Sequence, residues 1–135
     1  MDLNINIIGY VRNTFNKLQY HQTDALMRTV STIEIKEEYV NGLYKIENYR
    51  ELNILWYFDR SKGYDLRTTT HSGDYRGVFA CCSPHRPSSI GLTRVTLLEC
   101  DGNILRVTGL DALNGTPVLD IKPSLYLDTP SAFIP

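Results

Sequence analysis

Two alternating apolar runs joined by Asp101-Gly102 constrain the fold of this chain most tightly. Ile90–Glu99 and Asn103–Gly109 each have the length of a strand and alternate apolar with polar residues. An Asp-Gly pair between two such runs favours a two-residue hairpin turn, because the turn requires positive φ. The pattern therefore predicts two antiparallel strands with a tight connection.

The remaining strand-length segments contain little helical pattern between them. They are Leu3–Val11, Ile33–Ile35, Leu52–Phe58, Arg76–Cys82 and Thr116–Lys122. Leu52–Phe58 is almost continuously apolar, which predicts a strand covered on both faces. One or two short helical turns are expected within 37–49. The chain is therefore predicted to be mainly all-β, as a small closed or nearly closed antiparallel β-barrel of about six to seven strands, because closure removes exposed edges.

Composition indicates one domain covering residues 1–135. The chain is 42% hydrophobic and has a formal net charge of -1, so bulk attraction to a polyanion or an anionic membrane is not expected. No apolar run approaches the roughly 20 residues that span a bilayer, and the first residues lack a targeting pattern. We expect a cytoplasmic protein without a membrane segment.

Three cysteines, an odd number, are expected to be reduced thiols. Cys81 and Cys82 fall in the predicted strand 76–82, where neighbouring side chains point to opposite faces. They could not ligate one metal ion together, and the Cys-x2-Cys spacing of structural zinc sites is absent. No metal is expected.

Gly77–Gly91 departs most from ordinary barrel filling. Pro84 and Pro87 fix their own φ and restrict the residues before them, so the loop between them is held in few conformations. Arg86 offers a planar donor fork to a carboxylate or phosphate. The functional interpretation is a binding loop, and the alternative is a stiff barrel turn with a solvated arginine.

A second cluster lies in Gly109–Pro123, where two aspartates flank a tight turn at Asn114-Gly115. Asp120 alternates with Leu119 and Ile121, so it is expected to face away from the surface against which they pack. Its carboxylate could face a cleft. Alternatively, this segment is an edge strand protected by charge.

Residues 59–75, with their flanks, mix cations, tyrosines and aspartates in what is expected to be a long exposed loop. Such a mixture is compatible with RNA contact by charge and stacking, and equally with a solvated loop. The residues concerned are Arg60, Lys62, Arg67, His71 and Arg76, the tyrosines 57, 64 and 75, and the aspartates 59, 65 and 74.

Two long blocks, Gly77–Leu92 and Gly109–Pro123, resemble the TrmO/TsaA-like (YaeB-type) family of S-adenosylmethionine-dependent tRNA methyltransferases. Three shorter matches are Ile8–Val11, Glu34–Leu43, and Leu52–Phe58 with the Arg60-Ser61 pair. The resemblance covers nearly the whole chain. It implies a small β-barrel methyltransferase that works as a homodimer, with S-adenosyl-L-methionine near the subunit interface. The implied acceptor is the exocyclic amine of a threonylcarbamoyl-modified adenosine beside the tRNA anticodon.

The resemblance also implies site residues. The positions matching the donor-binding blocks are Ser83, Pro84, Arg86, Pro87, Ser88, Ile90, Gly91, Asp111, Gly115, Thr116 and Lys122. Arg86 is expected to pair with a carboxylate of donor or acceptor. Asp120, or alternatively Asp111, is expected to orient or deprotonate the amine. Arg86 and Asp120 are therefore the candidate catalytic residues.

This chain departs from the family pattern at three places. Cys81-Cys82 replaces Thr-Arg, Ser88-Ser89 replaces Asn-Pro, and Asn114 replaces an aspartate. These changes leave two alternatives open: a methyltransferase of the same fold with a small-molecule or other acceptor, and a non-catalytic module that binds S-adenosylmethionine.

Overall fold

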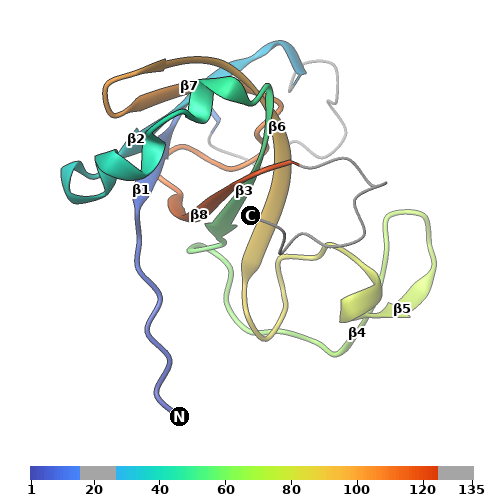
Figure 1. Ribbon diagram of the computed structural model, residues 1–135. Helices are drawn as coiled ribbons and strands as arrows, with labels where there is room; N and C mark the ends of the chain where they lie inside the picture. The colour runs from blue at the N-terminus through green and yellow to red at the C-terminus, as the bar shows by residue number, and fades with distance from the viewer. Residues whose placement is uncertain (16–26, 125–135) are drawn as a thin grey trace.

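Six antiparallel strands close into a barrel in the computed structural model, which describes residues 1–15 and 27–124 (Figure 1). The strands are β1 (Gly9–Arg12), β2 (Val30–Ile35), β3 (Glu51–Tyr57), β6 (Ile90–Asp101), β7 (Ile104–Thr108) and β8 (Pro117–Pro123). Their order around the barrel is β1-β2-β7-β6-β3-β8, and β8 pairs with β1 to complete the circle. The predicted mainly-β barrel is confirmed.

The β6–β7 hairpin turns at Asp101-Gly102, as predicted. Gly102 has a φ of 59°, the left-handed conformation that such a turn requires and that glycine adopts without steric cost. The register of the pair shifts between Leu97 and Glu99, which marks a β-bulge. The long strand β6 therefore bends as it passes from β3 to β7.

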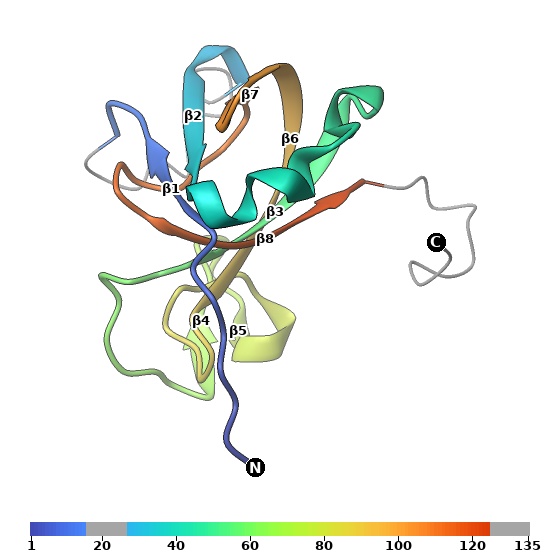
Figure 2. The ribbon, with the colours of Figure 1, turned by 60° about the vertical axis from the view of Figure 1, so that its left-hand side comes forward.

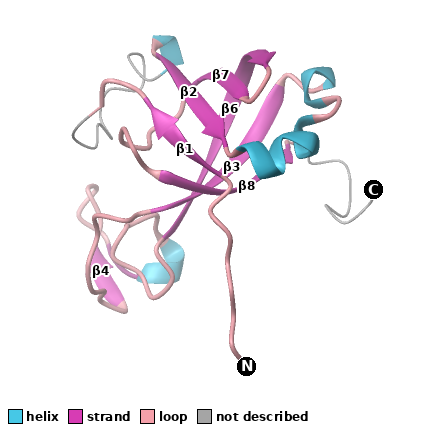
Figure 3. Cartoon of the chain, turned by 90° about the vertical axis from the view of Figure 1, so that its left-hand side faces the viewer, coloured by secondary structure: helices cyan, strands magenta, loops and turns pink. Residues whose placement is uncertain are grey.

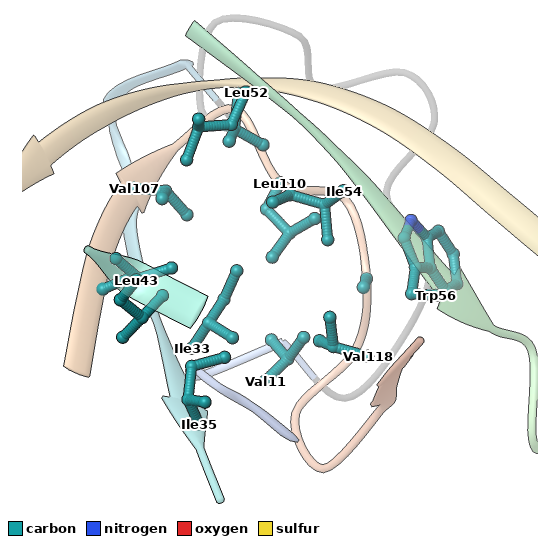
Figure 4. Packing of buried hydrophobic residues seen from close by; sticks show 13 residues of the cluster. Val11, Ile33, Ile35, Leu43, Leu52, Ile54, Trp56, Val107, Leu110 and Val118 are labelled. Atoms are coloured by element: carbon teal, nitrogen blue, oxygen red, sulfur yellow. The ribbon is translucent and has the colours of Figure 1, made fainter. Parts of the chain in front are cut away.

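The barrel interior is filled by the inward-facing residues of every strand (Figure 4). In β3, Leu52, Ile54 and Trp56 are buried, whereas Tyr57 is 43% exposed. The prediction that Leu52–Phe58 is covered on both faces is thus wrong for the outer face. Leu110, from the segment after β7, also packs into the core. Each such burial contributes about 1.5–3 kcal/mol before entropy is counted.

Three short 3-10 helices occur within the described residues, and two of them confirm the helical turns expected within 37–49. Helices η1 (Glu37–Leu43) and η2 (Ile46–Asn48) lie between β2 and β3, and η3 (Val78–Ala80) follows β5 (Figure 3). None of the helices in residues 1–15 and 27–124 is long and apolar enough to cross a membrane.

A two-stranded sheet of β4 (Arg67–Thr69) and β5 (Tyr75–Gly77) stands beside the barrel (Figure 2). The expected loop 59–75 is therefore an excursion that contains most of a small hairpin. The predicted strand 76–82 is wrong beyond Gly77, because η3 begins at Val78 and Pro84 follows shortly. Consequently Cys81 and Cys82 do not lie in a strand.

The predicted first strand is also too long at its start. Leu3 and Ile5 are 75% and 55% exposed, and residues 1–6 run away from the barrel (Figure 1). Their alternation is present, but a strand needs neighbouring backbone groups to pair with. That pairing begins at Ile8, whose N–H donates to the carbonyl oxygen of Val118 at 2.9 Å, and the strand itself begins at Gly9, opposite Ile35 and Val118.

Replacing Gly9 by alanine is expected to destabilise the barrel by about 2 kcal/mol or more. A Cβ at this position would lie 2.4 Å from the carbonyl oxygen of Glu34, and backbone cannot yield as a flexible side chain can. Gly42→Ala is the matched control, because its Cβ would meet no atom within 4 Å. Urea unfolding of both variants measures the difference, and equal free energies of unfolding would contradict the expectation.

Candidate functional site

The two long sequence blocks meet at a cavity of about 160 Å³ beyond the end of β3, which we call the Trp56 cavity. Its lining comprises Trp56, Phe58, Asp59, Arg60, Ser61, Pro84, His85, Leu113 and Thr116. Pro84 and His85 belong to the proline-braced loop, and Leu113 and Thr116 belong to the second block. The fold therefore brings together the two segments that the sequence pattern singled out.

Trp56 is positioned by its neighbours on β6. Gly91 lies opposite it in the register, and a Cβ on Gly91 would come within 2.4 Å of the indole ring. The indole Nε1 donates to Thr93 Oγ1 at 3.0 Å, and that hydroxyl donates to Asp111 Oδ1 at 2.5 Å. Asp111 is thus held by a hydrogen-bond chain that ends on Trp56, and Gly91 is required for the packing of the indole.

The corner after β3 joins the two blocks. Arg60 donates through Nη2 to the carbonyl oxygen of Asn114, and Ser61 Oγ donates to the carbonyl oxygen of Pro84 at 3.3 Å. Ser61 Oγ also lies 3.0 Å from His85 Nδ1, within hydrogen-bond distance. The charge of Arg60 is only loosely matched by Asp59, at 4.0 Å and largely exposed to solvent.

Sequence reasoning did not place this corner in the site. The sequence pattern placed Trp56 and Phe58 in an apolar strand and Arg60 in an exposed loop. The ring centres of Trp56 and Phe58 lie 4.2 Å apart, with an angle of 55° between the ring planes, and both rings line the cavity. The sequence could have indicated this corner by its position. Arg60-Ser61 comes just after the longest apolar run, with Asp59 between them, so it lies where that strand leaves the barrel.

Arg86 supports the loop that carries it. Its Nη1 donates to the carbonyl oxygens of Cys81 at 2.9 Å and Ser83 at 3.1 Å. The Ser83 hydroxyl in turn accepts from the backbone N–H of His85 at 3.2 Å. The guanidinium is partly buried, so the loop is stiffened by side-chain bonds as well as by its prolines.

A wider cleft adjoins the Trp56 cavity across Pro84 and His85. It has a volume of about 790 Å³ and runs between residues 68–72 of the β4–β5 hairpin and residues 81–85 of the loop. Arg76 also lines it and pairs with Asp74 at 2.7 Å. This outer cleft is rich in hydroxyl groups, and its boundary with the Trp56 cavity is formed by the same two loop residues.

Within one chain, Asp120 lies away from the Trp56 cavity. Trp56 pairs with Val118 at the end of β3 near the site, whereas Asp120 lies on the outer face of β8 and lines a separate cavity. Its carboxylate is 3.4 Å from Lys122 Nζ. Ile121 packs against the core, as predicted, and Asp120 and Lys122 lie together. The expectation for Leu119 is wrong: Val118 is buried in the core instead, because the register with β3 shifts between Leu55 and Trp56. Within one chain, Arg86 and Asp120 do not line a common cavity.

The remaining predicted residues occupy the rim and the turn. Pro87, Ser88 and Ile90 are exposed along the loop, and Thr116 is buried beside the cavity. Asn114, at the departure from the family's aspartate, accepts the backbone N–H of Asn13 through Oδ1 at 3.1 Å. An aspartate could accept the same bond, so the departure preserves this structural contact.

The cysteines do not assemble a site. Cys82 is exposed, and Cys81 and Cys100 are partly buried. Burial, followed by the carboxylates of Glu47 and Asp101, raises the pKa of the Cys100 thiol above its usual range, so this thiol stays protonated at neutral pH. Among the residues that the structure describes, no three His, Cys, Asp or Glu side chains are grouped to hold a metal ion.

The profile of the tRNA-methyltransferase O N-terminal domain matches residues 11–129. The chain belongs to this family. An S-adenosyl-L-methionine-binding protein of Archaeoglobus fulgidus is 42% identical over 121 residues, which are 85% of this chain and 84% of that protein. A rat protein named tRNA (adenine(37)-N6)-methyltransferase is 30% identical over 126 residues, covering 86% of this chain and 29% of its own length.

Solved structures of the family agree with the fold. The crystal structure of TrmO from Pseudomonas aeruginosa superposes with a TM-score of 0.78 at 28% identity, covering all of this chain and 61% of that one. A probable S-adenosyl-L-methionine-binding protein of A. fulgidus is 44% identical over 119 residues, 86% of this chain, and the match spans only 32% of its length. The chain therefore spans only part of the length of these family members.

Replacing Thr93 by valine is expected to lower stability by about 1–3 kcal/mol, because the indole N–H of Trp56 and the Asp111 carboxylate both lose their partner. Thr96→Val, on the same strand and partly buried, is the matched control. Urea unfolding compares the two. A Thr93 variant as stable as the Thr96 variant would show that the chain of hydrogen bonds does not hold the site together.

Proposed function

We propose that residues 1–135 act as one barrel domain of an S-adenosyl-L-methionine-dependent methyltransferase that modifies tRNA in the cytoplasm. The proposed acceptor is the exocyclic amine of an adenosine beside the anticodon, in its threonylcarbamoyl-modified form. The observation that carries the proposal is the junction of both family blocks at the Trp56 cavity. The name of the rat relative supports the tRNA acceptor.

The residues around this junction fit S-adenosylmethionine chemically. The Trp56 cavity, about 160 Å³, is smaller than the roughly 300–1,000 Å³ of typical ligand sites. Together with the outer cleft, which shares Pro84 and His85, it offers room for an extended nucleoside with an amino-acid tail. Two aromatic rings attract a cation, and Arg60 can bind a carboxylate bidentately. When bound, the group supplies an electrophilic methyl on sulfur.

The chain's own residues would then bind, orient and exclude water. Trp56 and Phe58 shield the cavity, and a dry site favours a displacement that disperses charge. Arg60, which lines the cavity, would hold a carboxylate, while the loop from Ser83 to Gly91, stiffened by Arg86, would position the nucleoside. Asp111, fixed by Thr93, is the nearer of the two candidate carboxylates for orienting the amine.

Asp120 and Lys122 would contribute only across a subunit contact, because within one chain they lie away from the Trp56 cavity. A homodimer is supported by an apolar outer face on β3 and β6. Tyr57 lies opposite Ile90, and Leu55 lies opposite Leu92, which is 68% exposed. We call this surface the outer β3–β6 face. A partner subunit bound there would cover the outward-facing apolar residues of β3, as the continuous apolar run of that strand predicts.

A second candidate function is binding of S-adenosylmethionine without methyl transfer. The A. fulgidus relative that matches this chain over 84% of its own length is named a binding protein. At Cys82, where the family pattern has an arginine, an exposed thiol faces the outer cleft. The missing cation would weaken the binding of a polyanionic acceptor more than the binding of the donor. The smaller side chain also leaves room for a different, smaller acceptor.

Arg86→Ala is expected to lower S-adenosylmethionine affinity or turnover at least about tenfold, through a lost charge-assisted bond and a loosened loop. Arg106→Ala, an exposed arginine on β7, is the control. Calorimetry gives the affinity, and radiolabelled methyl transfer to bulk tRNA gives turnover. An unchanged Arg86 variant refutes the residue assignment, and absence of binding by the wild type refutes the function. Binding without labelled tRNA favours the second candidate or another acceptor.

Leu92→Glu is expected to weaken self-association at least about tenfold, because it places a charge on the outer β3–β6 face. Leu98→Glu is the matched control, since Leu98 is 52% exposed on the same strand but lies beyond the part of β6 that pairs with β3. Analytical ultracentrifugation across a concentration series measures both. A wild-type chain that stays monomeric, or equal effects of the two variants, would contradict the proposed interface.

A further inference from the structure

A second cavity, of about 480 Å³, lies at the other end of the barrel, between η1, η2 and the paired strands β3 and β8. We call it the barrel-end cavity. Leu52 lines it and Trp56 lines the Trp56 cavity, and these residues are four positions apart on β3, about 13 Å along an extended strand. The two cavities share no lining residue, so they are separate sites.

The floor of the barrel-end cavity is apolar and continuous with the core. Ile35, Leu43 and Leu52 line it and are themselves buried. Its sides carry aromatic rings: Tyr44 is 82% exposed and Tyr49 is 45% exposed. Large rings beside a hollow that opens onto the core offer a flat ligand both an apolar base and surfaces for stacking.

The polar groups at the rim are few and of different kinds. Lys45 adopts a φ of 65°, and it is the only non-glycine residue with positive φ in the described part of the chain. Its ammonium lies 5.4 Å from the centre of the Tyr44 ring. Asn48 offers an amide. The Asp120 carboxylate accepts the backbone N–H of Ile121 through Oδ1 at 2.9 Å, and its Oδ2 lies 3.4 Å from Lys122 Nζ, which leaves further lone pairs on both oxygens.

We propose that the barrel-end cavity binds a nucleoside monophosphate carrying an exocyclic amino group. The apolar floor and tyrosines suit the base, because base stacking on aromatic side chains tolerates any base. Asp120 and Asn48 suit an amino group and its neighbouring ring nitrogen, and Lys45 suits the phosphate at the rim. The backbone strain at Lys45 is consistent with a functional position, since such conformations gather at ligand sites.

This chemistry has two sources, a free nucleotide and an unpaired nucleotide of an RNA. Binding there does not require methyl transfer. Within one chain the cavity is separate from the Trp56 cavity, and Tyr44 and Lys45, which line it, are not among the proposed donor-site residues. If the source is an RNA, the cavity holds a nucleotide away from the one that reacts, and it would position the strand on the barrel.

The test uses the full chain with 5′-AMP, adenosine and single-stranded oligoadenylate as probes, followed by calorimetry and by NMR shifts of the residues lining the cavity. Tyr44→Ala is expected to weaken 5′-AMP binding roughly tenfold, and Tyr44→Phe, which keeps the ring, is expected to retain it. Lys45→Asn is expected to weaken 5′-AMP but not adenosine, because asparagine tolerates positive φ and only the charge is lost.

The outcomes separate the possibilities. Tighter binding of oligoadenylate than of 5′-AMP, lost with Tyr44→Ala, identifies an RNA as the source, and equal binding identifies a free nucleotide. S-Adenosylmethionine affinity should be unchanged in both variants, so failure of the proposed function would leave this result intact. No binding of any probe, or equal affinity in wild type and Tyr44→Ala, overturns the inference. Displacement of 5′-AMP by S-adenosylmethionine in competition also overturns it.

Discussion

The packing of Trp56 against Gly91 is the contact on which the site depends. The indole is 3% exposed, and it occupies the space that any side chain on Gly91 would need. Because the indole N–H is then bonded to Thr93, and Thr93 to Asp111, the segment after β7 is tied to the mouth of the barrel. The Trp56 cavity forms where that segment and the proline-braced loop meet, so this cross-strand contact supports the position of the cavity.

The two ends of the barrel have different surroundings because β3 and β8 cross its whole length. One end is bordered by the polar corner at Arg60 and the stiff loop, and the other is covered by η1 and η2. The block Gly109–Pro123 is therefore continuous in sequence but divided in space. Its Thr116 lines the Trp56 cavity, whereas its Asp120 lines the cavity at the opposite end of the barrel. A register shift between Leu55 and Trp56 accompanies this division.

Local features of the fold were predictable because they depend on neighbouring residues. The Asp101-Gly102 turn and the alternation in β7 are of this kind, and closure followed from the number of strands without helices. The first strand was wrong before Gly9 because alternation does not reveal whether a partner strand is present. The path after Gly77 was wrong because η3 and Pro84 end the strand pattern earlier than the apolar residues suggest.

Part of the site was predictable for a similar reason. Conformational restriction marked Pro84 and the turn at Gly115, whose φ is 86°, and the fold brings these segments to one cavity. The pairing of Arg86 with Asp120 was beyond sequence reasoning, because the distance between two strand positions depends on bulges and on strand length. Trp56 was missed because a buried aromatic residue in a strand has the same pattern whether it fills the core or borders a cavity.

Trp56 is the single tryptophan of the chain, so its indole gives one resonance in a ¹H–¹⁵N spectrum. Titration with S-adenosylmethionine, followed at that resonance and in parallel by calorimetry, tests whether the ligand binds at the Trp56 cavity. We expect the indole signal to shift with the same dissociation constant that calorimetry reports. Saturation in the calorimeter with an unmoved indole signal would place the ligand elsewhere and contradict the proposed site.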